Sequence, residues 1–182
     1  YTAAVTLVFE PDPGLPDDAS VAFLPQVVRT LPVHFEVGES ESQEIVFQTG
    51  TTAGRITLAV ALGPYSEEKV VRVLPEPAAI TAARATSASA AAEVVLTGFD
   101  TTRTVAKVSF TFYLKNGEAA APGRIDTDVS PSFASYFKTI SGSAFSLRAN
   151  FPVSGTYSEL EGVEVEITNT AGVSRTGRLR FE

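Results

Sequence analysis

The chain holds a single histidine, His34, and this limits the acid–base and metal chemistry that its side chains could perform. A zinc site built from histidine and cysteine, or a Cys–His nucleophile pair, is excluded because there is no second histidine and no cysteine. A Ser-His-Asp triad would need support such as a Gly-x-Ser-x-Gly turn, and the sequence has none. Since His34 stands between Val33 and Phe35, we expect it on the polar face of a strand, in contact with solvent.

Two pairs of carboxylates are spaced two residues apart, which on a strand places both members on one face. They are Glu164 with Glu166, and Asp126 with Asp128. Paired carboxylates can perform glycoside hydrolysis, but no aromatic cleft accompanies these two pairs in the sequence. Carboxylates on one face are also typical of a strand that meets water. We therefore expect no catalytic residues and predict that the chain is not an enzyme.

A third group of carboxylates lies in a segment rich in proline and glycine. It contains Glu10, Asp12, Asp17 and Asp18. Calcium takes several oxygen ligands, which loop carboxylates and carbonyls can supply. The spacing does not match an EF-hand loop, so we expect a solvated acidic loop and predict that folding needs no metal or other cofactor. Calcium at Asp12, Asp17 and Asp18 is the alternative.

Five aromatic residues could form an exposed platform on which a sugar stacks: Tyr113, Phe133, Tyr136, Phe137 and Tyr157. The candidates for ligand binding are Tyr113, Tyr136 and Tyr157. Tryptophan, which stacks best on sugars, is absent. Burial in a core is the more usual use of aromatic side chains.

The elements that must position these side chains are strands, because alternation of apolar and polar residues dominates the sequence. It is clearest over residues 5–9, 31–37, 56–62, 108–114, 145–151 and 163–167. No segment shows helical spacing, and the alanine-rich residues 78–92 are interpreted as an edge strand followed by a turn. Asn116-Gly117 and Pro122-Gly123 are typical turn sequences. The predicted fold is all-β, with two tandem immunoglobulin-like antiparallel β-sandwiches.

The boundary between the two domains is predicted at Leu74-Pro75-Glu76-Pro77, since a strand cannot continue through two prolines. This gives domains 1–76 and 77–182. The first holds 11 acidic and 4 basic residues (−7), and the second holds 10 of each (0). An acidic surface repels phosphates, so we expect no binding to nucleic acid. A weak internal repeat relates Phe47-Gln48-Thr49 to Phe137-Lys138-Thr139, each before a glycine and an alternating strand.

The sequence also bears on the protein's location. It contains no methionine and begins with Tyr1, so we expect a fragment of a larger protein with a signal peptide upstream. No apolar run approaches the roughly 18 residues of a membrane helix, and no membrane insertion is expected in this segment. An extracellular or cell-surface location is predicted, with the oligomeric state left open.

Three segments resemble paired β-sandwich repeats near the C-termini of large exported proteins of soil bacteria, within the broad class of bacterial immunoglobulin-like and fibronectin-III-like modules. They are residues 47–54 (FQTGTTAG), 96–103 (LTGFDTTR) and 133–137 (FASYF). Such modules act as spacers or adhesion segments. The resemblance therefore implies a non-catalytic structural or adhesion module whose partner is a protein or glycan at the cell surface. A carbohydrate-binding module that uses the aromatics of the second domain is the alternative.

Overall fold

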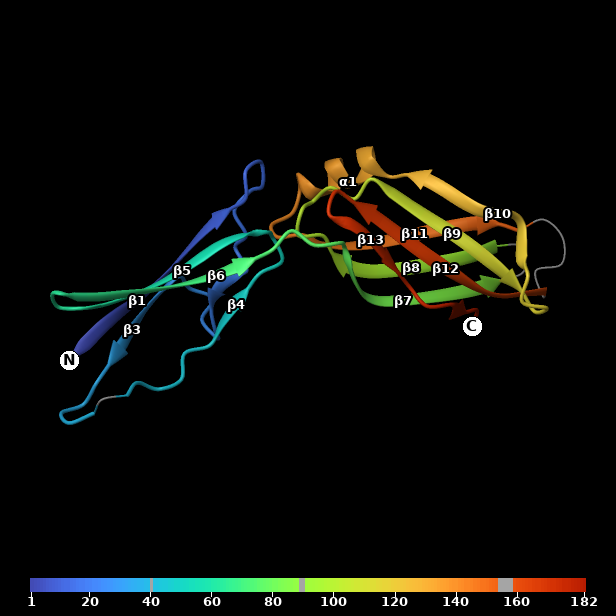
Figure 1. Ribbon diagram of the computed structural model, residues 1–182. Helices are drawn as coiled ribbons and strands as arrows, with labels where there is room; N and C mark the ends of the chain where they lie inside the picture. Colours follow the sequence, from blue (N-terminus) through green and yellow to red (C-terminus); the bar gives the residue numbers. More distant parts are fainter. Residues whose placement is uncertain (40, 89–90, 154–158) are drawn as a thin grey trace. The chain divides into compact units, whose positions relative to one another are not determined.

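The computed structural model describes residues 1–39, 41–88, 91–153 and 159–182 (Figure 1). Its sheets are all antiparallel, and the described residues include one short helix. The chain divides into two compact units, Tyr1–Leu74 and Pro75–Glu182, which are described separately. Among the described residues, no helix has the length and apolar content that crossing a membrane requires.

The first unit is built from one large sheet and one small one. The large sheet has the strand order β3-β1-β5-β6, and the small sheet pairs β2 with β4. The strands are β1 (Thr2–Pro11), β2 (Val21–Phe23), β3 (Thr30–His34), β4 (Phe47–Thr49), β5 (Gly54–Leu62) and β6 (Tyr65–Val73).

Alternation along β1 explains how this unit forms its core. The inner-face residues Val5, Leu7 and Phe9 are buried against Val21 and Phe23 of β2. At Gly54, the first residue of β5, a Cβ atom would lie 2.5 Å from the ring of Phe9, so only glycine fits beside it.

The second unit consists of two sheets and a helix. One sheet has the order β10-β9-β12-β13, with β14 also paired to β12, and the other has the order β11-β8-β7. Its elements are β7 (Ala79–Ala88), β8 (Ala91–Phe99), β9 (Lys107–Leu114), β10 (Ala119–Asp128), α1 (Ser130–Phe137), β11 (Ala144–Pro152), β12 (Leu160–Asn169), β13 (Gly172–Arg175) and β14 (Leu179–Arg180).

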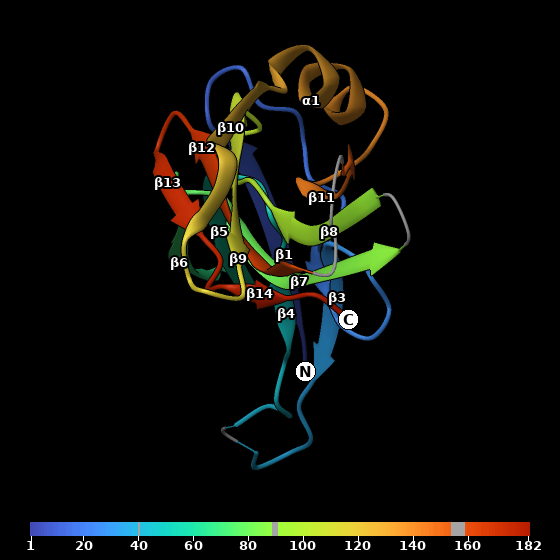
Figure 2. The same ribbon diagram turned by 90° about the vertical axis from the view of Figure 1, so that its right-hand side faces the viewer.

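The core of the second unit lies between its two sheets. Figure 2 shows β10, β12 and β13 on one side and β8 and β11 on the other, with α1 over one end. The predicted strand over residues 108–114 is confirmed as β9, which lies between β10 and β12. Its inner-face residues Val108, Phe110 and Phe112 are buried and belong to one cluster with Val94 and Leu96 of β8.

The expectation that the chain has no helix is wrong at α1. This helix begins at a proline-containing first turn and buries Phe133 and Phe137, which are four residues apart and so lie on one face. Eight residues are too few to show a repeating apolar stripe in the sequence. Because Phe137 ends a helix while Phe47 begins strand β4, the weak sequence repeat does not correspond to a structural repeat.

Two further expectations concern turns and strands. Pro122-Gly123 is not a turn between strands: it lies within β10, where the pairing with β9 shifts register between Ala119 and Arg124. The alanine-rich residues 78–92 do form strands, since β7 and β8 cover most of them.

Candidate functional site

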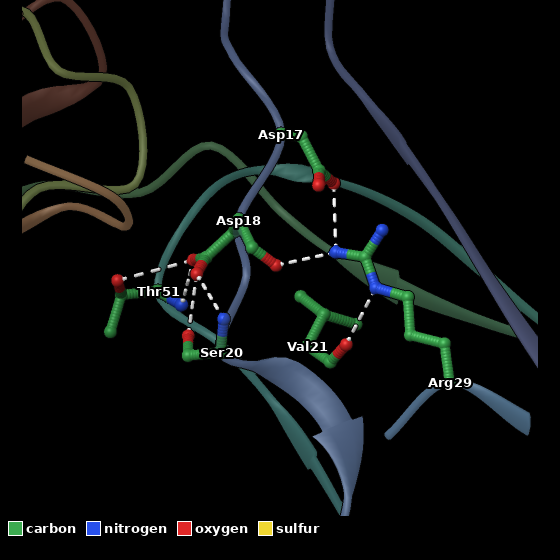
Figure 3. A network of polar contacts seen from close by, with 6 residues as sticks. All are labelled: Asp17, Asp18, Ser20, Val21, Arg29 and Thr51. Atoms are coloured by element: carbon green, nitrogen blue, oxygen red, sulfur yellow. Dashed lines mark hydrogen bonds and ion pairs between the residues drawn. The ribbon is translucent and has the colours of Figure 1, made fainter. Parts of the chain in front are cut away.

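The carboxylate of Asp18 is fully buried and lies at the centre of a hydrogen-bond network in the first unit (Figure 3). Its Oδ1 accepts hydrogen bonds from the backbone N–H of Ser20 (3.0 Å) and from its hydroxyl (2.5 Å). Its Oδ2 accepts from the backbone N–H of Thr51 (2.9 Å), in the turn between β4 and β5. The carboxylate therefore joins the segment before β2 to the segment before β5. Gly50 allows the close approach, because a Cβ there would lie 2.7 Å from Oδ2.

The other carboxylates of the predicted acidic loop are paired with arginines. The Arg29 guanidinium donates to Asp17 Oδ1 (2.8 Å) and to the backbone carbonyl of Asp18 (2.7 Å). Asp12 pairs with Arg72 of β6 at 2.6 Å. Each predicted calcium ligand thus has its own donor. Within the described ranges, no three His, Asp or Glu side chains gather closely enough to hold a metal ion together.

The environment of Asp18 makes the stability of the first unit depend on pH. Burial raises the pKa of this carboxyl, but hydrogen bonds from Ser20, Thr51 and Thr52 outweigh it and hold the pKa below its usual value. We expect the first unit to keep the stability from this network above the unfolded pKa of about 3.9, and to lose it as the pH falls through the lower folded value. Thermal unfolding between about pH 5 and pH 2, followed through first-unit amide signals, measures this.

The matched control for this prediction is Asp17→Asn, since Asp17 is exposed and its hydrogen bond from Arg29 does not involve the Asp18 carboxylate. Asp18→Asn should flatten the acid dependence of the first unit, while Asp17→Asn should leave most of it. Equal acid dependence in the two variants would show that another carboxylate is responsible.

A second buried carboxylate, Asp100, organises the second unit in a similar way. Its Oδ1 accepts from the backbone N–H of Thr102 (3.0 Å) and from its hydroxyl (2.7 Å), and from the side-chain amide of Asn169 (2.8 Å). Its Oδ2 accepts from the backbone N–H groups of Thr104 (2.6 Å) and Val105 (2.8 Å). This carboxylate fixes the connection between β8 and β9 and ties it to the end of β12.

Asn169 extends the network to the segment by which the chain enters the second unit. Its amide donates to the carbonyl of Glu76 (2.9 Å), and the N–H of Glu76 donates to the hydroxyl of Thr101 (3.0 Å). The backbone of Glu76 is therefore held through both its N–H and its C=O. We name Glu76, Asp100, Thr101 and Asn169 the Glu76 clamp.

Sequence reasoning missed this pattern, although a local signal was present. Asp18-Ala19-Ser20, Asp100-Thr101-Thr102 and Asp128-Val129-Ser130 each place a hydroxyl residue two positions after an aspartate. In all three, the aspartate accepts from both the N–H and the hydroxyl of that residue. Asp128, predicted as half of a carboxylate pair, thus binds Ser130 at the start of α1, and these hydrogen bonds lower its pKa.

The predicted carboxylate pair on β12 lies in a row of ion pairs that crosses the outer face of the second unit. Glu166 contacts Arg124 of β10 at 2.7 Å and Arg175 of β13 at 2.8 Å. The hydrogen bond from Arg124 is the main cause that lowers the pKa of Glu166. Asp126 also has a lowered pKa, through hydrogen bonds from Ser109 and then from Arg124. A general acid in glycoside hydrolysis needs a raised pKa, so these environments do not suit that chemistry.

Tyr113 lies in the same outer face and is covered on one side of its ring. The guanidinium of Arg178 is 3.6 Å from the ring centroid, and the Tyr113 hydroxyl donates to Glu164 (3.0 Å). Glu164 also lies 3.9 Å from Arg178. The three side chains form one stacked and hydrogen-bonded group, in which a cation already occupies one aromatic face.

The remaining predicted residues lie apart from this group. Tyr136 is on α1, is 39% exposed and donates to the carbonyl of Ala144 (3.3 Å). Phe133 and Phe137 are buried, and Tyr157 lies outside the described residues. The structure does not bring Tyr113 and Tyr136 together on one sheet face, and sugar binding stays a prediction. His34 is exposed, as expected, and its Nδ1 is 2.9 Å from the hydroxyl of Thr2.

An apolar groove of about 410 Å³ lies on the inner face of the large sheet of the first unit. We call it the inner-face groove. Its floor is formed by inner-face residues of the large sheet, and its wall by the small sheet and the connection before β4: Val5, Val33, Leu58, Val60 and Val71, then Phe23, Phe35, Ser42, Ile45 and Phe47. Sequence alternation identified the floor strands but could not show how far the small sheet covers them.

The comparisons with known proteins identify no further candidate site residue. Neither a protein-family model nor a curated protein matches the chain.

Proposed function

We propose that the chain is a non-catalytic structural or adhesion module of a larger secreted or cell-surface bacterial protein, built from two tandem immunoglobulin-like sandwiches. The observation that carries this proposal is that the second unit holds the chain firmly at both of its ends. A module that connects other parts of a protein must resist tension applied through its ends.

At the incoming end, the Glu76 clamp supports the proposal. The backbone of Glu76 donates to the hydroxyl of Thr101 and accepts from the amide of Asn169, and Asn169 is itself fixed by the buried Asp100. Next to it, a Cβ at Gly172 would lie 3.0 Å from Pro77, so this segment packs closely on the turn between β12 and β13. Tension along the chain therefore reaches a buried polar network before it reaches β7.

At the outgoing end, residues Phe181 and Glu182 run parallel to β7. Ala85 forms a parallel bridge with Phe181, and the N–H of Glu182 donates to the carbonyl of Ala85 (3.1 Å). The N–H of Ser87 donates to the carbonyl of Glu182 (3.3 Å). When two parallel segments are pulled from opposite ends, they must slide past each other, so all these bonds bear the load together. This geometry favours a module that carries force.

Pulling single molecules of the full chain from its two ends tests the proposal. We expect the second unit to unfold in one distinct event, at a force well above that at which an unfolded chain extends. Asn169→Ala should lower that force, because it removes the hydrogen bond to Glu76 and leaves buried polar groups unpaired, at a cost of about 2–3 kcal/mol. Asn150→Ala is the matched control, since Asn150 is exposed on β11.

Two results would contradict the proposed function. One is extension of the second unit without a distinct unfolding event. The other is an equal effect of Asn169→Ala and Asn150→Ala, which would show that the clamp does not bear the load.

A further inference from the structure

The inner-face groove exists because the small sheet covers only part of the large one. Along β5 the inner-face side chains change from buried Ile56 to half-buried Leu58 and then to Val60, which is 41% exposed. Along β6 the facing positions change from half-buried Val71 to the exposed Glu67, which pairs with Val60. An apolar sheet face normally packs against a second layer. Here that layer does not cover the part of β5 and β6 that lies next to the turn joining them.

The small sheet also ends in an open edge on the side of the groove. Phe23 of β2 bridges to Val28 on one side, in the segment that leads into β3, and pairs with Phe47 of β4 on the other. The second layer thus runs from the β3 side through β2 to β4. Among the described strands, β2 is the one partner of β4. A further strand added beside β4 would lie over Leu58, Val60 and Val71, where the groove is.

We propose that the inner-face groove binds an extended segment of a partner polypeptide, which adds as a strand to the free edge of β4 and inserts alternate apolar side chains between the two sheets. The backbone groups of β4 would supply main-chain hydrogen bonds, and the groove would select the side chains at every second position. This inference rests on the proposed function to the extent that it names the partner of an interaction module.

The charges of the connection that borders the groove indicate the chemistry of this partner. The connection between β3 and β4, residues 35–46, contains the four glutamates Glu36, Glu39, Glu41 and Glu44 and no lysine or arginine. The same connection supplies Phe35, Ser42 and Ile45 to the groove. Glu67 lies in the groove itself, beside Lys69. The segment that fits has apolar residues at alternate positions and lysine or arginine between them, because opposite charges steer and orient association.

The test uses the full chain and a capped peptide of about nine residues that alternates valine with lysine or arginine, within the usual length of a strand. Calorimetry measures the affinity, and amide chemical shifts locate the peptide. We expect binding, with the largest shifts at β4, β5 and β6. A peptide with glutamate in place of lysine and arginine should bind about tenfold more weakly or worse. A scrambled peptide with its valines together should not bind measurably.

Matched variants separate the groove from the rest of the sheet. Val60→Gln should weaken binding about tenfold, whereas Val8→Gln, at a valine of similar exposure on the outer face of β1, should change it less than about twofold.

Strand addition is tested by N-methylation, which removes backbone donors. One peptide is methylated at its valine amides and another at its lysine and arginine amides, and one of the two should lose affinity, because these amides point to opposite edges of a strand. Equal binding by both would overturn the proposal.

Other results would also overturn the proposal. These are no binding of the basic peptide, and equal effects of Val60→Gln and Val8→Gln. Self-association of the chain through this face, if it excludes the peptide, would overturn it as well. Tighter binding of a fatty acid than of the peptide would overturn it in favour of a small apolar ligand. None of these results changes the pulling behaviour of the second unit, so the two proposals fail separately.

Discussion

Asp100→Ala is expected to lower the free energy of unfolding of the second unit by about 3–6 kcal/mol, because it leaves several buried donors without a partner. The backbone N–H groups of Thr102, Thr104 and Val105 and the amide of Asn169 all donate to this carboxylate. An unpaired buried donor costs about 1–3 kcal/mol, and a domain has about 5–15 kcal/mol in total. The second unit should therefore become marginal. Thermal unfolding followed by amide signals from both units measures this change.

Two controls accompany the Asp100→Ala experiment. The first unit should melt at an unchanged temperature, since Asp100 belongs to the second unit. Asp128→Ala removes the same local pattern of bonds, here to Ser130, from an exposed aspartate, and should cost only a small fraction of the effect. Similar losses from both substitutions would show that the local turn, rather than the buried network, determines the stability.

Phe110→Ala should lower the free energy of unfolding of the second unit by about 3–5 kcal/mol, the usual cost of truncating a buried phenylalanine. Phe110 is 3% exposed, and its ring meets that of Phe151 edge to face at a centroid distance of 4.7 Å. Phe112 meets the same ring at 4.9 Å, so Phe112→Ala should have a comparable effect. Chemical unfolding with probes in each unit measures the loss.

Tyr113→Ala tests which face of β9 is buried. Its ring lies on the outer face, with Arg178 stacked on it, so the expected cost is about 1 kcal/mol. A one-residue change of register would exchange the two faces. If Tyr113→Ala proves as damaging as Phe110→Ala, the outer face contributes to stability as much as the core does.

The strands could be predicted from the sequence because a strand's period of two depends only on neighbouring residues. The alternation around Val108, Phe110 and Phe112 is strict, and β9 forms where it predicts. The helix α1 could not be predicted in this way. Its apolar face consists of Phe133 and Phe137, and a single pair at helical spacing also occurs by chance in strands and loops.

The candidate sites depend more strongly on contacts between distant residues. The bonds from Asp18 to Ser20 and from Asp100 to Thr102 are local, and the sequence contains their pattern. The partner Thr51 is 33 residues from Asp18, and Asn169 is 69 residues from Asp100. Such partners depend on strand order and register, which alternation does not specify. The same holds for the arginines that pair with Glu166, which come from strands on either side of β12.

Prolines in the outermost strands affect how the chain behaves at high concentration. Pro32 lies within β3, at the edge of its sheet, and Pro122 lies in β10, at another edge, where the register shift interrupts the ladder. A proline offers no N–H to a neighbouring chain, and a disrupted ladder is a poor template for continued pairing. These two edges therefore resist edge-to-edge pairing with the strands of other copies of the chain.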